Sequence, residues 1–397
     1  MTAQVIVMNR YGVAVASDSA ITVTGKATRT YNSGEKISYL ETAPVAVLQS
    51  GSDSVYGVPW QVLLKMWSQM RGEAEFETIR KYARSFCEWL NSQAELIEPS
   101  PAVSRDAYRG HLLDIRSNVI AALNEIGVDA KYTRSPSPDI AAIVDSQVDR
   151  YVGRAASEHI SDDALDSWSG ENQAFISESI SWAYDDIPVT EHLEDRSREL
   201  GGLLAVLKYP ITDSATLAFC GYGRDRFFPS IYHADFAGAF GSGIETYEEE
   251  ETEIRPGNRV AIIPLGLSEP IYTFLGGTSR PFDELARRII DTMASSAARD
   301  HPEAKELLEK GRQQYADEFM KLRQEQFIQP MLDVVETLPI NELTRLADAL
   351  VGLASLRQVV RGETSVGGPI DVARITRHGG FAWERHKGAA IVHDRSH

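Results

Sequence analysis

Cysteine is scarce in this sequence of 397 residues, which contains only Cys87 and Cys220. Two cysteines cannot form the disulfide framework of a secreted protein, so a reducing compartment is expected. No apolar run approaches the ~20 residues that cross a bilayer. The first twenty residues also lack a basic segment leading into a continuous apolar stretch, as a secretory signal would have. We therefore expect a cytoplasmic protein that does not enter a membrane.

Basic residues are too few to balance the acidic ones, and the formal net charge is −17. Nucleic-acid binding needs a basic face to contact phosphates, so no nucleic-acid partner is expected. The densest acidic run, EEEETE at residues 248–253, lies between glycine-containing segments at 241–243 and 256–257. Turn residues on both sides favour a solvated hairpin over a cation site.

Several catalytic motifs are also missing. The nine histidines show no H-E-x-x-H pattern, no G-x-S-x-G motif is present, and no phosphate-binding loop occurs. Cys220 lies in an apolar run, which predicts a buried small side chain rather than a nucleophile. Metal-dependent hydrolysis, a serine triad and nucleotide hydrolysis therefore have no support, and neither a metal nor another cofactor is predicted.

Short apolar runs with β-branched residues predict strands at the start, the middle and the end of the chain. The last two are joined at residues 378–380, where glycine allows the positive φ of a tight turn. The predicted strands cover residues 5–7, 13–16, 36–40, 45–48, 216–220, 230–234, 244–247, 259–264, 370–376 and 381–384.

Apolar residues at helical spacing separate these groups of strands. The spacing begins near Pro59, where Trp60 and Trp67 are expected to be core residues of the first helix, and it recurs later in the chain. This order predicts the α+β class, with one sheet system assembled from both ends of the chain. The predicted core domain is discontinuous and covers residues 2–58, 201–280 and 355–390, with a helical insertion at 59–200 and a helical segment at 281–354.

The first two residues, Met1 and Thr2, permit one specific chemistry. Methionine aminopeptidase removes Met before a small residue, which would leave Thr2 as the N-terminal residue. An N-terminal threonine combines a hydroxyl nucleophile with its own α-amine, whose ordinary pKa near 8 suits a general base. Thr2 is therefore the candidate nucleophile.

Three residues in the following strands complete the candidate site. Asp18 lies at the end of the second strand, Lys36 at the head of the next, and Gly51 at the end of an apolar strand. A lysine charge beside Thr2 would lower the pKa values of its amine and hydroxyl, and Asp18 would hold that lysine in place. The backbone N–H of Gly51, or of Ser50 or Gln49 if the register differs, could bind the oxyanion. Lys26 is the competing lysine.

These residues resemble the opening of proteasome β-subunits and the bacterial HslV peptidase. T-x-x-V-x-V, followed by G-V-A-V-A-S-D-S, matches the family's N-terminal threonine and first aspartate, at Thr2 and Asp18. Lys36, in E-K-I-S-Y-L, matches the family's lysine if the preceding loop is two residues longer. A central segment, G-Y-G-R-D-R-F-F-P-S-I-Y-H-A-D, resembles the family's central hairpin.

The tail, R-G-E-T-S-V-G-G-P-I-D-V, resembles the family's closing turn, where an aspartate, a serine and two glycines lie near the threonine. By this resemblance Glu363 replaces the aspartate, Val366 takes the serine position with Ser365 beside it, and Gly367 and Gly368 match the glycines. A further family serine falls at Gly266, with Ser268 two residues away. The G-V-P-W segment at 57–60 and the V-G-G-P-I-D-V segment at 366–372 resemble uncharacterised bacterial proteins, which implies a distinct bacterial branch.

The resemblance implies an αββα four-layer sandwich with large helical insertions. It also implies a threonine-type hydrolase of amide or peptide bonds, with Thr2, Asp18, Lys36 and Gly51 as site residues and specificity pockets in the apolar segment 45–51. A homo-oligomer is expected, and an unfoldase partner is not identified. Two alternatives remain: an N-terminal-nucleophile amidase that acts on a small molecule, and a catalytically inactive scaffold or regulatory protein.

Overall fold

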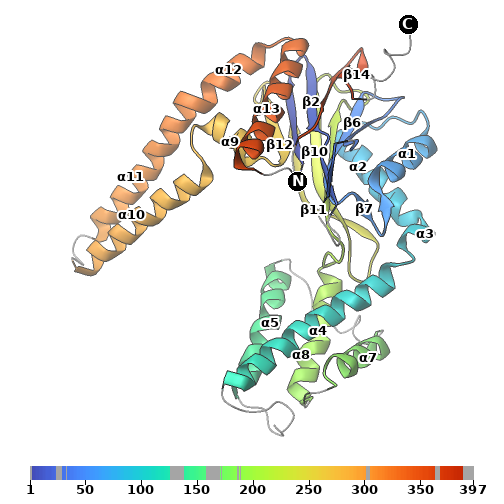
Figure 1. Cartoon of the computed structure of the whole chain (residues 1–397), viewed down its shortest axis with the longest axis vertical. Coiled ribbons are helices and arrows are strands. Elements are labelled where there is room, and N and C mark those ends of the chain that lie inside the picture. The colour runs from blue at the N-terminus through green and yellow to red at the C-terminus, as the bar shows by residue number, and fades with distance from the viewer. Residues whose placement is uncertain are drawn as a thin grey trace.

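The computed structural model describes residues 2–23, 29–32, 34–125, 138–157, 170, 172–185, 187, 189–300, 305–362 and 367–387. Figure 1 shows two central sheets with helices against them, a helical lobe below and a two-helix arm that projects to the left. Helices and antiparallel strands are both extensive, so the predicted α+β class is confirmed.

The first sheet contains strands from both ends of the chain. Its order is β12-β1-β2-β13-β14, and every neighbouring pair is antiparallel. This order places the N-terminal strand between the second strand and a strand from the middle of the sequence. The strands are β1 (Ala3–Asn9), β2 (Gly12–Asp18), β12 (Ala261–Gly266), β13 (Ile370–Thr376) and β14 (Gly380–Arg385).

The second sheet has the order β11-β10-β9-β6-β5 and is also antiparallel. Two small hairpins, β3–β4 and β7–β8, lie outside both sheets. The strands of the second sheet are β5 (Ile37–Tyr39), β6 (Val45–Gly51), β9 (Ala215–Gly221), β10 (Ser230–Gly238) and β11 (Ile244–Glu253). The hairpin strands are β3 (Ile21–Val23), β4 (Arg29–Tyr31), β7 (Ser54–Val55) and β8 (Val58–Pro59).

The two sheets pack face to face around a shared apolar core. Ile6 and Val15 of the first sheet lie in the same buried cluster as Leu48, Ala218 and Ile231 of the second. Side chains alternate along a strand, so each of these strands also presents an apolar set to its other face. Both faces of the central strands are therefore buried.

Helices cover the two outer faces. On the second sheet, α1 (Trp60–Arg71) and α2 (Ile79–Ser92) bury Trp60, Trp67 and Phe86 against Phe219, as predicted for the two tryptophans. On the first sheet, three helices pack against Val5, Val7 and Ala14: α9 (Glu269–Gly276), α12 (Gln329–Thr337) and α13 (Ile340–Arg361). The order across the molecule is helices, sheet, sheet, helices.

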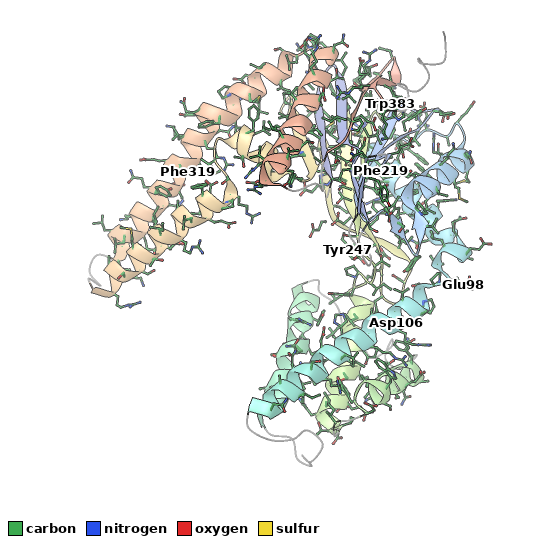
Figure 2. All side chains as sticks on the ribbon, in the orientation of Figure 1. Glu98, Asp106, Phe219, Tyr247, Phe319 and Trp383 are labelled. Atoms are coloured by element: carbon green, nitrogen blue, oxygen red, sulfur yellow. The ribbon has the colours of Figure 1, made fainter. Side chains whose placement is uncertain are left out.

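The helical lobe has a core of its own. Tyr108, Leu112 and Leu204 belong to the buried cluster of the lobe. Phe240, which follows β10 of the sandwich, belongs to the same cluster. Glu98 and Asp106 mark the path of the chain from the sandwich into the lobe, and Phe219 lies inside the sandwich (Figure 2). The short α3 (Ala94–Ile97) precedes the lobe, whose helices are α4 (Ser100–Glu125), α5 (Pro138–Ser157), α7 (Gln173–Ala183) and α8 (Glu191–Val206).

The arm consists of α10 (Arg280–Asp300) and α11 (Lys305–Arg323), which continues through the π-helical turn η3 (Gln324–Ile328) into α12. No residue of α11 is buried. At the base of the arm, Arg323 binds Asp283 at 3.0 Å. A side chain at Gly276 would meet the Arg323 guanidinium 2.3 Å away, so glycine lets the base of the arm close.

Several boundaries differ from those predicted. The acidic run 248–253 lies in the β10–β11 hairpin with its side chains exposed or half-buried, as expected, but it lengthens the predicted strand 244–247, and residues 250–253 pair with β10 beyond an irregularity in the register. Lys36 lies immediately before β5 rather than within it. The two small hairpins were not predicted, because their strands are only two or three residues long. Within the described ranges, no helix has the length and apolar character needed to span a membrane.

Candidate active site

Thr2 lies at the start of β1, beside the end of β12. The carbonyl oxygen of Thr2 accepts a hydrogen bond from the Leu267 N–H at 2.6 Å, and Ala3 pairs with Gly266. A Cβ atom at Gly266 would lie 2.1 Å from the Thr2 oxygen. The last residue of β12 therefore approaches Thr2 so closely that only glycine fits there. Figure 1 shows the N-terminus where the arm and the lobe diverge.

Asp18 connects Thr2 to Lys36. Its Oδ1 atom accepts the backbone N–H of Ala3 at 2.9 Å and the Lys36 ammonium at 2.7 Å. Its Oδ2 atom accepts the Gly367 N–H at 3.1 Å. The Asp18 side chain is fully buried, so these donors replace the water that would otherwise solvate its charge. One carboxylate thus holds a lysine beside the backbone of the candidate nucleophile.

Only 8% of the Lys36 side chain is exposed. Because little water can solvate its ammonium group, the charged form of Lys36 carries a desolvation penalty. Burial lowers the pKa of Lys36 below its ordinary value, Asp18 opposes that change, and the positive charge of Lys387 adds to the lowering. The buried ammonium can act as a fixed positive charge near Thr2, or lose its proton at a lower pH than a surface lysine.

Gln4 was not among the predicted site residues, although it is fully buried beside them. Its Nε2 atom donates to Ser17 Oγ at 3.0 Å and to the Gln49 carbonyl at 2.9 Å. The side chain thereby joins β1 to β6 of the other sheet. The sequence does contain a sign of this role, since Gln4 is a polar residue inside an otherwise apolar strand. A polar side chain that is buried must find hydrogen-bond partners.

Gly51 ends β6 with a positive φ of 86°. A Cβ there would lie 2.6 Å from the Ser214 carbonyl, so the close approach of another strand explains this glycine. Gln49, two residues earlier, is bound by Gln4 and also donates its N–H to the Lys36 carbonyl at 3.0 Å. The end of β6 is therefore tied to the strand that begins at Thr2.

Glu363, Ser365 and Val366 lie outside the described residues, as does the competing Lys26. Gly367 is described and reaches Asp18, and its carbonyl accepts the Ser19 N–H at 3.3 Å. A side chain at Gly368, where φ is 78°, would contact Asn32.

Ser268, the other serine weighed from the sequence, precedes α9. Its N–H binds the Gly266 carbonyl at 2.8 Å, and its hydroxyl makes no capping hydrogen bond to the helix. Ser268 therefore helps to shape the turn that follows Gly266.

Other reactive groups are placed unfavourably for catalysis. Burial raises the pKa of the Cys87 thiol to about 11 and also raises that of Cys220, so neither is a thiolate near neutral pH. Among the described residues, no cluster of three or more His, Cys, Asp or Glu side chains could hold a metal ion.

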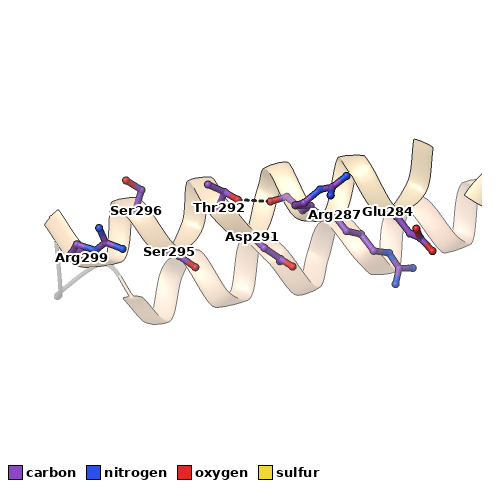
Figure 3. Close-up of a pocket in the computed structure, with 8 residues that line it drawn as sticks. Glu284, Arg287, Asp291, Thr292, Ser295, Ser296 and Arg299 are labelled. Atoms are coloured by element: carbon purple, nitrogen blue, oxygen red, sulfur yellow. Dashed lines mark hydrogen bonds between the residues drawn. The ribbon is translucent and has the colours of Figure 1, made fainter. Parts of the chain in front are cut away.

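Two surface hollows differ in their position relative to the candidate site. A groove of about 660 Å³ between α1, β5 and β14 is bordered by Glu35 and Ile37, on either side of Lys36, and by Trp383. A second hollow is lined by eight side chains of α10 alone, and Figure 3 shows Thr292 bonded within it to the backbone of its own helix. The second hollow belongs to the exposed face of one helix, so of these two hollows it is the groove that adjoins the candidate site.

Comparisons with known proteins yield structural matches only. No model of a known protein family matches the chain, and no curated protein matches it. A structure of Anbu (ancestral beta-subunit) from Yersinia bercovieri has 10% identity and a TM-score of 0.29, over 99% of this chain and 91% of that one. Anbu from Hyphomicrobium sp. strain MC1 has 9% identity and a TM-score of 0.30, over 98% of this chain and 86% of that one.

These findings correct the family assignment made from the sequence. The resemblance named proteasome β-subunits and HslV, whereas the matched structures are Anbu proteins. The resemblance rested on three segments, at the N-terminus, in the middle and in the tail, and these cover too little of the chain to separate related groups.

Proposed function

We propose that this chain is an amide hydrolase of the N-terminal-nucleophile type, in which Thr2 attacks after Met1 is removed. The observation that carries the proposal is the bridging of Lys36 Nζ and the Ala3 N–H by the same oxygen of Asp18. This places a buried ammonium next to the backbone of Thr2. The packing of two antiparallel sheets between helices supports the further proposal that the fold is the αββα sandwich of such hydrolases.

In the proposed reaction the Thr2 hydroxyl attacks the carbonyl carbon of an amide. The free α-amine of Thr2, directly or through a water, accepts the hydroxyl proton and passes it to the leaving amine. The Lys36 charge stabilises the alkoxide that forms when the Thr2 hydroxyl loses its proton, while Asp18 orients Lys36. The Gly51 N–H, or that of Ser50, holds the oxyanion, since the Gln49 N–H is already bonded to the Lys36 carbonyl. Water then hydrolyses the resulting ester and releases Thr2.

Glu363 and Ser365 remain predicted contributors to this site. Gly367, the next described residue along the chain, donates its N–H to Asp18. We propose that Glu363 and Ser365 orient the Thr2 amine.

The proposed substrate is a peptide, because an extended chain is able to pair with the strand ends that surround Thr2. The apolar residues of β6 favour an apolar side chain before the cleaved bond. A small-molecule amide is the alternative substrate, and the groove beside Lys36 has the volume of a small-molecule site. An inactive scaffold is the remaining alternative.

Intact-mass measurement and covalent labelling test the proposal. The purified protein should lack Met1 and gain the mass of one β-lactone or epoxyketone inhibitor, which peptide mapping should place on Thr2. Thr2→Ala is the control that should not react, and Thr2→Ser should react because it keeps a hydroxyl. Retention of Met1, or equal labelling of Thr2→Ala, would overturn the mechanism and favour the scaffold alternative.

Substrate class is tested separately. A library of fluorogenic peptides should be cleaved with a preference for an apolar residue before the bond, and cleavage should disappear in Thr2→Ala. Acylation by the inhibitor without cleavage of any peptide would favour the small-molecule amidase.

A further inference from the structure

A second buried lysine–carboxylate pair lies beside the first. Lys387, just after β14, contacts Asp371 of β13 twice: its backbone N–H donates to Oδ1 at 2.9 Å, and its ammonium binds Oδ2. The Lys387 side chain is 14% exposed and the Asp371 side chain 4%. Groups this buried need partners to remain charged, and each satisfies the other. The reaction proposed above uses neither of them.

The third contact of Lys387 leads to the candidate site. Its ammonium donates to the Gly34 carbonyl at 2.7 Å, and Gly34 lies two residues before Lys36. The Gly34 N–H in turn donates to the Ser19 carbonyl at 2.9 Å, and Ser19 follows Asp18. One ammonium group therefore joins the C-terminal hairpin to the backbone that presents Lys36.

Ser19 extends this connection to the closing turn. Its hydroxyl donates to the Pro369 carbonyl at 2.6 Å, and its N–H to the Gly367 carbonyl. Gly367 reaches Asp18 from the same turn. The segments that carry Asp18, Lys36 and Gly367 are thus bonded to one another and to Lys387.

Lys387 also acts on Lys36 through its charge. The charged groups facing Lys36 are Asp18 across its ion pair and Lys387 behind it, and the positive charge of Lys387 helps to lower the pKa of Lys36. Asp371 neutralises part of the Lys387 charge. Removal of Lys387 would leave Asp371 buried and unpaired, which further favours a proton on Lys36.

We propose that Lys387 is a positioning residue for the Thr2 site, which fixes the Gly34–Lys36 backbone against the Asp18 strand and sets the electrostatic environment of Lys36. The role in catalysis rests on the proposed function. The effect on Lys36 itself does not depend on it.

The kinetic test uses the full chain and a β-lactone that acylates Thr2. Lys387→Met should slow acylation about tenfold or more, because small displacements of reacting groups cost at least this much. It should also move the alkaline limb of the pH–rate profile to higher pH, because a positive charge near Lys36 is removed. Lys387→Arg, which keeps the charge, should restore most of the rate. Lys310→Met, which removes an exposed lysine paired with Glu306, is the matched control and should behave as wild type.

A double variant covers the case in which Lys387→Met does not fold. Asp371→Leu combined with Lys387→Met leaves no unpaired charge, so it should fold, but it lacks the contact with Gly34. Slow acylation by the folded double variant supports the proposal. Acylation at the wild-type rate and with the wild-type pH profile overturns it.

A second readout does not require any activity. In protein labelled with ¹³Cε-lysine, the Lys36 signal, assigned with Lys36→Arg, should titrate at a higher pH in Lys387→Met than in wild type. A shift in this titration supports the proposal even if Thr2 is never acylated, in which case only the proposed function fails. An unchanged titration overturns the proposal whatever the activity.

Discussion

Gly266 has no side chain, and this leaves room for the Thr2 carbonyl group. The glycine has a φ of 68°, and a Cβ would lie 2.1 Å from the Thr2 carbonyl oxygen. Gly57 has a similar φ of 80°, but a Cβ there would meet nothing within 4 Å. Both glycines have a positive φ that strains other residues, but only a Cβ at Gly266 would collide with its surroundings, so the pair helps to separate the two effects.

Gly266→Ala should destabilise the fold by about 2 kcal/mol or more and reduce Thr2 acylation at least tenfold, because strain and collision both act. Gly57→Ala carries the strain alone and should cost about 1 kcal/mol with acylation unchanged. Urea unfolding and inhibitor labelling measure the two quantities. Equal effects of the two substitutions on acylation would show that Gly266 has no particular role at Thr2.

Lys36 predicts the pH dependence of the proposed reaction. The rate of acylation should rise as the Thr2 amine loses its proton, at a pH below its ordinary pKa of about 8, because the Lys36 charge disfavours the protonated amine. A lysine is charged below its pKa, and burial lowers the pKa of Lys36, so its charge is lost below the ordinary 10.5. The rate should therefore fall again at a pH below 10.5, and a stopped-time acylation assay across pH 6–11 measures both limbs. Lys36→Ala should lower the maximum on the order of 100-fold; a rate that keeps rising through this range would contradict the role of Lys36.

Among the elements, α13 and the arm make opposite contributions to the core. Leu343, Leu350 and Val351 of α13 are buried against the first sheet. None of the described residues of α10 and α11 belongs to any of the four buried clusters. The arm joins the sandwich at Gly276 and through η3, so its removal should leave the sheets and their covering helices in contact.

A short Gly-Ser linker in place of residues 282–322 should therefore change the melting temperature of the sandwich only slightly. Of the described residues in that range, none is buried, although Asp283 is largely covered, and the ends of the replaced segment lie close together, since Arg323 reaches Asp283. Thermal unfolding followed by circular dichroism measures the effect, with Leu350→Ala as a control that should cost about 2–5 kcal/mol. A larger loss from the arm replacement than from Leu350→Ala would show that the arm supports the core.

At the scale of the whole molecule, the arm presents an apolar stripe. Phe282, Leu285, Ile289 and Met293 are exposed and recur three or four residues apart, on one side of α10. The arm also has balanced charge: α10 carries four basic and four acidic residues, and α11 five and four. A chain with a net charge of −17 repels its copies over most of its surface, but not here. We propose that a second copy of this chain covers the stripe, in keeping with the predicted homo-oligomer.

Ile289→Glu combined with Met293→Glu should reduce the assembly to single chains of 43.9 kDa, because two charges would have to be buried at the contact. Sedimentation velocity measures the mass in solution. Arg287→Glu, on the polar face of α10 drawn in Figure 3, is the control and should leave the assembly intact. The same mass for wild type and the double variant would place any self-association elsewhere.

Local pattern was sufficient for many elements. Short apolar runs with β-branched residues located β1, β2, β6 and β13, and helical spacing located the buried Trp60 and Trp67, because burial leaves these patterns in the local sequence. The ends of elements were less predictable. The acidic residues 248–253 continue a strand through pairing with β10, an interaction that their own composition disfavours.

The sequence by itself determined that Thr2, Asp18 and Lys36 lie in or beside strands near the start of the chain, because short apolar runs mark those strands. Only the tertiary structure decided what surrounds them. Gly266 reaches Thr2 through the pairing of β1 with β12, and Gly367 and Lys387 reach Asp18 and Gly34 across more than three hundred residues. Such contacts depend on which strands become neighbours in the sheet, and that choice reflects the packing of the whole core rather than any local pattern.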